Sequence, residues 1–199
     1  MIGGKTLIDT LVGNPWLVAV LWGVLSILDF VATMLYSKAY REFLSAKVSY
    51  EGGMEMNPAF EKDVRQLRWF SPRYIISMLS VAILILLAGK LFPTMWFEIL
   101  SGAALLLVLI TDLRHIENLS MVWFLKSDPE GFKGRIEQSY KLSQRRVAVG
   151  VFNIGVLYLV VCLLTQRVFF LGGGAICMLY ALRHYLLSNR QFPKPVSKN

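Results

Sequence analysis

Residues 105–124 read LLLVLITDLRHIENLSMVWF, an apolar run long enough to enter a membrane before a dense group of polar side chains interrupts it. No other apolar segment of the chain holds so many polar residues within seven positions: Asp112, Arg114, His115, Glu117 and Asn118. In a helix, residues three or four apart share a face, so Asp112 and His115 would lie together, as would Arg114 and Asn118. The stretch therefore predicts a membrane helix with a polar site near its end.

The composition indicates a membrane protein. Hydrophobic residues make up 55% of the 199 residues and the mean hydropathy is +0.53, above the roughly 45–50% apolar usage of soluble domains. The net charge of +8 is carried by basic residues between the apolar runs, so we expect a lipid bilayer as partner and no nucleic acid. Cys162 and Cys177 lie in apolar segments, where cysteine packs as a small hydrophobe.

The hydrophobic pattern predicts an all-α bundle of five transmembrane helices. It forms one polytopic domain, residues 1–190, followed by a disordered tail, residues 191–199. The expected spans are residues 16–36, 73–91, 95–114, 147–165 and 168–187. Two basic connections, each predicted to hold a short amphipathic helix, join the spans. In the first connection, Asn57 and Pro58 would cap and begin that helix.

Two polar or small features inside the later spans predict helix packing. Asn153, in the fourth span, is expected to hydrogen-bond a neighbouring helix. The run Gly172-Gly173-Gly174, in the fifth span, permits a close approach of two helix backbones, and no preceding strand suggests a phosphate loop instead.

The distribution of Lys and Arg predicts the orientation of the chain. Only Lys5, Lys90 and Arg167 fall on one side of the predicted membrane, which leaves eighteen of the twenty-one basic residues on the other. Because basic residues favour the cytoplasmic side, we expect a multi-pass protein of the cell membrane with its N-terminus outside and its C-terminus in the cytoplasm.

This orientation gathers the unusual polar residues at the cytoplasmic face. Asp29, Asp112, His115 and His184 fall in the inner halves of their spans, and the loop residues Glu55 and Asn57 lie on the same side. No series of ionisable residues crosses the membrane, which disfavours a proton relay.

Three functions follow from this arrangement. The first is an inner-leaflet site that binds a metal or a polar headgroup, either as a binding site alone or as the site of a membrane enzyme. Its expected catalytic residues are Asp112, His115, Asp29 and Glu55. The expected ligands for a divalent metal are Asp112, His115 and Glu117. The expected contacts with a headgroup are Arg114, Asn118, Asn57 and His184. The alternative is a non-enzymatic scaffold or assembly subunit that binds anionic lipid, a membrane partner or a second copy. A small channel or carrier ranks third. No recognised catalytic motif is present, so enzymatic activity stays open.

Overall fold

The computed structural model describes residues 5–50, 60–128, 130 and 133–189. Its elements, in chain order, are α1 (Leu7–Val12), α2 (Pro15–Ala39), the π-helical turn η1 (Tyr40–Leu44), β1 (Val48–Tyr50), α3 (Glu61–Arg65), α4 (Pro72–Leu91), α5 (Thr94–Ser127), β2 (Ile136–Gln138), α6 (Tyr140–Thr165) and α7 (Val168–Ser188). Five helical segments among the described residues are long and apolar enough to cross a membrane: α2 with η1, α4, α5, α6 and α7. The predicted all-α membrane bundle is confirmed.

Local sequence signals start three of the long helices. Asn14 accepts a hydrogen bond from the backbone N–H of Leu17, with proline as the first residue of α2. Ser71 caps α4 in the same way, and Ser139 caps α6. Each cap satisfies a backbone N–H that the first turn of a helix leaves without an intrahelical partner.

Two helices, α5 and α6, extend far beyond their predicted spans. α5 continues thirteen residues past 114, to Ser127, and α6 begins at Tyr140 rather than 147. At about 1.5 Å per residue, the 34 residues of α5 extend about 51 Å, well beyond the roughly 30 Å of a hydrocarbon core. The length of an apolar run predicts only the part of a helix that lies in the hydrocarbon core. The helix itself can continue into polar sequence, because its backbone hydrogen bonds do not depend on apolar side chains.

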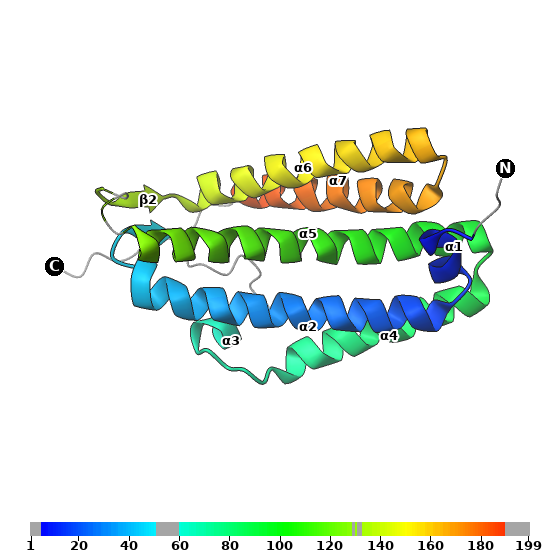
Figure 1. Ribbon diagram of the computed structural model, residues 1–199, viewed down its shortest axis with the longest axis horizontal. Coiled ribbons are helices and arrows are strands. Elements are labelled where there is room, and N and C mark those ends of the chain that lie inside the picture. Colours follow the sequence, from blue (N-terminus) through cyan, green and yellow to red (C-terminus); the bar gives the residue numbers. More distant parts are fainter. Residues whose placement is uncertain (1–4, 51–59, 129, 131–132, 190–199) are drawn as a thin grey trace.

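α5 forms the centre of the bundle, with α2 and α4 on one side and α6 and α7 on the other (Figure 1). At two glycines, the backbone of α5 lies directly against the backbone of α7. A Cβ added to Gly102 would lie 1.8 Å from the carbonyl oxygen of Phe169, and one added to Gly172 would lie 1.8 Å from that of Ile99. The structure thus shows the close helix approach that the glycine run predicted.

The two basic connections meet at one end of the bundle, here called the basic end. β1 pairs in parallel with β2, with Val48 opposite Ile136 and Tyr50 opposite Gln138. In the first connection the described helix is only α3; Arg41 caps its last turn by donating to the carbonyl of Val64 at 3.0 Å. In the second connection the described residues form β2, and the helical residues there belong to the ends of α5 and α6 rather than to a separate short helix.

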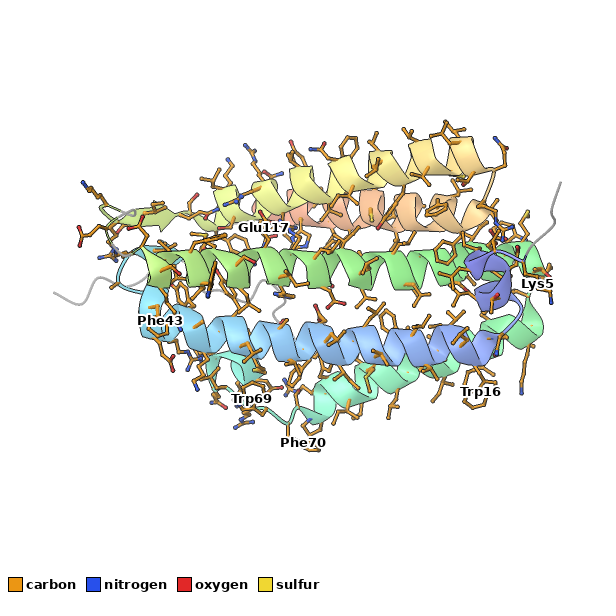
Figure 2. All side chains as sticks on the ribbon, in the orientation of Figure 1. Lys5, Trp16, Phe43, Trp69, Phe70 and Glu117 are labelled. Atoms are coloured by element: carbon orange, nitrogen blue, oxygen red, sulfur yellow. The ribbon has the colours of Figure 1, made fainter. Side chains whose placement is uncertain are left out.

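Tyr74, the third residue of α4, joins the start of that helix to the part of α2 that contains Asp29. Its hydroxyl donates to the carbonyl oxygen of Ser26, at 2.5 Å, and reaches Asp29 Oδ2 at 3.4 Å. The 20 residues of α4 span about 30 Å, roughly one hydrocarbon thickness. Asp29 therefore lies at the level of the first turn of α4. Trp69 and Phe70, just before α4, are exposed (Figure 2), as aromatic residues are at a membrane interface.

Asn153 differs from its prediction. It lies on the exposed face of α6, near the middle of the helix, and forms no hydrogen bond with the described part of the chain. The expected packing role inside the bundle is therefore wrong. Spacing in the sequence locates a residue along a helix but does not say how the helix is rotated against its neighbours.

An ion-pair network closes the opposite end of the bundle. Arg167 Nη2 donates to Asp9 Oδ1 at 2.7 Å, and its Nε lies 3.2 Å from Glu98 Oε1. Hydrogen bonds from the side chain and backbone of Thr6, together with Arg167, lower the pKa of Asp9 from 3.8 to about 2. The hydrogen bond to Asp9 in turn raises the pKa of Arg167. The network joins α1 and α5 to the turn between α6 and α7.

This network predicts an acid-sensitive contribution to stability. Because folding lowers the pKa of Asp9, its stabilisation is complete above pH 3.8 and is lost as the pH falls toward about 2. We expect wild type to unfold at a higher temperature than Asp9→Asn at pH 6, with the difference disappearing near pH 2. Thermal unfolding in detergent between these values measures it. A difference that does not change with pH would contradict the prediction, and Glu42→Gln, in an exposed pair with Lys38, is the control.

Candidate functional site

A cavity of about 310 Å³ lies at the basic end, among α2, α5, α6 and α7. Two opposed sets of polar side chains line it. The acidic wall comprises Asp29, Thr33, Tyr74 and His115, from α2, α4 and α5. The basic wall comprises Arg114, Ser143, Arg146 and His184, from α5, α6 and α7. α5 contributes to both because His115 and Arg114 point to different sides of this central helix.

Hydrogen bonds and an ion pair hold the acidic wall together. His115 Nε2 lies 3.1 Å from Thr33 Oγ1 and 3.3 Å from Asp29 Oδ1. The same carboxylate receives the Tyr74 hydroxyl at 3.4 Å. The structure therefore brings together Asp29 and His115, which the sequence placed in the same site although 86 positions separate them.

The geometry of the acidic wall is not that of a catalytic triad. In a triad, the histidine bridges a carboxylate on one ring nitrogen and a nucleophile on the other. Here Asp29 and Thr33 both approach Nε2, and Nδ1 of His115 is buried without a hydrogen-bond partner among the described residues. A proton could not pass through the ring from Thr33 to Asp29, so this arrangement does not activate the threonine.

Asp112, the expected centre of the site, lies behind the acidic wall. It is 7% exposed and does not line the cavity, although it interacts electrostatically with Asp29 and His115. Neither carboxylate oxygen has a hydrogen-bond partner within the described chain. Asp112 therefore adds negative character behind Asp29 without reaching a ligand directly.

Arg114 is the most unusual residue of the basic wall. Its guanidinium packs against α6, where its Nη2 lies 3.8 Å from the position that a Cβ on Gly150 would occupy. The side chain is half-buried, and no hydrogen bond or ion pair joins it to a described residue. Glu117 attracts it from one turn away on α5 without forming an ion pair, and Arg146 adds a second positive charge. The basic wall therefore presents positive charge that no described carboxylate pairs with directly.

His184 and Gln144 form a buried pair beside Arg114. His184 is 2% exposed and Gln144 is fully buried, and His184 Nδ1 contacts Gln144 Oε1. The amide oxygen can only accept, so Nδ1 carries a proton in this contact. His184 Nε2 and the Ser143 hydroxyl have no partner in the described residues, although both side chains line the cavity. Two buried polar groups are thus left for a ligand.

Three aromatic rings stand beside Asp29 on the cavity surface. The ring of Tyr74 lies 4.6 Å from Phe30 and 5.5 Å from Phe60, measured between centroids, and all three line the cavity. We call them the aromatic corner. Sequence reasoning missed them because Phe and Tyr in membrane helices are ordinarily read as packing or interfacial residues.

Of the remaining predicted site residues, two line the cavity and two lie outside the residues that the structure describes. Glu117 and Asn118 line the cavity, and Figure 2 shows Glu117 on the side of α5 that faces α6 and α7. Glu55 and Asn57 lie outside the described residues. Within the described ranges, no three His, Cys, Asp or Glu side chains lie close enough to hold a metal ion. Asp112, His115 and Glu117 therefore do not converge as a ligand set, because Glu117 lies on another face of α5.

The cavity thus combines a half-buried guanidinium, two carboxylates and aromatic rings near the start of α4. Such an arrangement is suited to binding a polar ligand, and it lacks the geometry of a nucleophilic triad. Comparison with protein-family models, curated proteins and solved structures finds no match for the chain.

Proposed function

We propose that this multi-pass membrane protein binds a phosphate ester in the cavity, with Arg114 and Arg146 as the phosphate contacts. Arg114 carries the proposal, because a half-buried guanidinium that forms no ion pair with a described residue is costly unless a ligand supplies the anion. Arginine also matches phosphate geometry, since two N–H groups can donate to two phosphate oxygens.

A lipid headgroup is the source of phosphate that the location favours. The cavity lies near the level where α4 begins, and basic pockets between membrane helices bind anionic headgroups on the cytoplasmic side. Its volume of about 310 Å³ is at the lower end of the roughly 300–1,000 Å³ range of ligand pockets, sufficient for a headgroup while the acyl chains remain in the bilayer. In this proposal the basic end faces the cytoplasm, as the positive-inside rule predicts.

Binding assays with Arg114→Gln test the proposal. Detergent-purified protein is titrated with glycerol 1-phosphate and, separately, with short-chain phosphatidic acid, and calorimetry gives the dissociation constants. Loss of a charged hydrogen bond contributes about 1.5–3 kcal/mol, so we expect affinity to fall about 10- to 150-fold. Binding of both ligands would support phosphate recognition from a soluble source, and binding of the lipid alone would support a headgroup site.

Arg145→Gln is the matched control. Arg145 neighbours Arg146 on α6 and is exposed like it, but Arg145 does not line the cavity and its guanidinium lies over the ring of Tyr185. The same change of charge there should alter affinity less than twofold. Equal losses in the two variants would indicate general attraction of anions and overturn the site, as would wild-type affinity in Arg114→Gln. Thermal unfolding of each variant verifies that it is folded.

A further inference from the structure

We infer that the ligand of this cavity carries a positively charged amine as well as its phosphate, as a zwitterionic phosphoethanolamine headgroup does. The inference rests on the proposed function and specifies its ligand. Its basis is the arrangement of opposite charges on the two walls, together with the aromatic corner.

The charges lining the cavity favour a ligand that has both signs. Arg114 and Arg146 face it from α5 and α6, whereas Asp29 faces it from α2, with Asp112 behind. Glu117 also lines the cavity and lies on the α5 side, near Arg114. The formal charges of the lining residues, two arginines and two carboxylates, therefore sum to zero. A ligand with negative charge alone would satisfy the basic wall but would gain nothing from Asp29.

The aromatic corner identifies the place of the amine. Phe30, Phe60 and Tyr74 line the cavity next to Asp29, and the Tyr74 hydroxyl reaches its carboxylate at 3.4 Å. Aromatic faces attract cations through their ring quadrupole, and a neighbouring carboxylate adds a direct charge interaction. A cation held there would balance Asp29, while the phosphate of the same ligand contacts the arginines on the opposite wall.

The experiment compares ligands that differ in the amine. Wild-type protein in detergent is titrated with short-chain phosphatidylethanolamine and short-chain phosphatidylglycerol, which share a phosphodiester but not the amine. Phosphoethanolamine and ethyl phosphate form the corresponding soluble pair. We expect the amine-bearing member of a pair to bind at least about tenfold more tightly, which corresponds to about 1.4 kcal/mol.

Asp29→Asn should remove this preference, so that phosphatidylethanolamine and phosphatidylglycerol bind with affinities within about twofold of each other. Phe60→Leu provides a second variant that leaves the Asp29–His115 contact intact, and it should lower the preference for the amine-bearing ligand. Glu42→Gln, an exposed carboxylate outside the cavity, is the control for lost negative charge.

The outcomes separate this inference from the proposed function. If wild type binds both members of each pair equally, or prefers phosphatidylglycerol, the amine site is overturned while phosphate binding at Arg114 stands. A preference that survives in both Asp29→Asn and Phe60→Leu would also overturn it. If no phosphate ligand responds to Arg114→Gln, the proposed function itself fails.

Discussion

Gly172→Ala is expected to destabilise the bundle by about 3 kcal/mol, because it forces apart two helices that touch through their backbones. The added Cβ would lie 1.8 Å from the carbonyl oxygen of Ile99 and 3.0 Å from the backbone nitrogen of Ala103. No rotamer change relieves a contact with backbone. α5 and α7 must separate, and the packing around Gly102 and Leu106 on the same interface would be lost with them.

Unfolding by a denaturing detergent measures this effect. Gly23→Ala is the matched control, because an added Cβ there meets nothing within 4 Å and α2 merely gains a better helix former. We expect Gly23→Ala to be as stable as wild type or slightly more stable. Equal stability of Gly172→Ala and Gly23→Ala would show that α5 and α7 are not in backbone contact.

The sequence predicted the helices of this fold better than their contacts. Apolar runs and caps such as Asn14-Pro15 are local signals, so five spans and the start of α2 followed from them. The glycine run predicted a close helix contact but not its partner, because small residues such as Gly102 do not indicate which of the other spans they face. Contact between distant helices depends on the rotation of each about its axis, which spacing alone does not fix.

The candidate site was predicted in the same partial way. Charged residues within apolar sequence are rare enough to notice, so Asp29, His115 and Arg114 were found. Asp112 and Glu117 were assigned to one metal site with His115, but the packing of α5 turns them toward different surroundings. Closeness in the sequence was not enough to predict a shared site, because other helices pack on both sides of α5 and neighbouring residues face different helices.

Residues with ordinary local sequence were missed altogether. Gln144 was included in a solvated basic connection, since the apolar run that defined the fourth span begins only at Val147. In the structure α6 starts earlier and buries Gln144 completely. Ser139 was the available signal for this earlier start, because a serine that caps a helix marks where the helix begins. A helix that begins there includes Ser143 and Gln144.

The Gln144–His184 pair leads to a second large effect on stability. Gln144→Leu keeps the approximate volume but leaves the buried N–H of His184 without its acceptor. A buried donor deprived of its partner costs about 1–3 kcal/mol, and we expect about 2 kcal/mol here. His184→Phe should have a similar cost, since Gln144 Oε1 would then be the group left unpaired.

A double-mutant cycle tests whether these losses arise from the pair. Replacing both partners by apolar side chains removes the polar groups together, which is nearly neutral when the shapes fit. We therefore expect Gln144→Leu with His184→Phe to be more stable than the sum of the single losses predicts, with a coupling of at least about 1 kcal/mol. Detergent unfolding of the four proteins gives this coupling directly. Additive losses would mean that Gln144 and His184 do not interact, and His184 would then be held in the cavity wall by packing, which includes its contact with the ring of Tyr180.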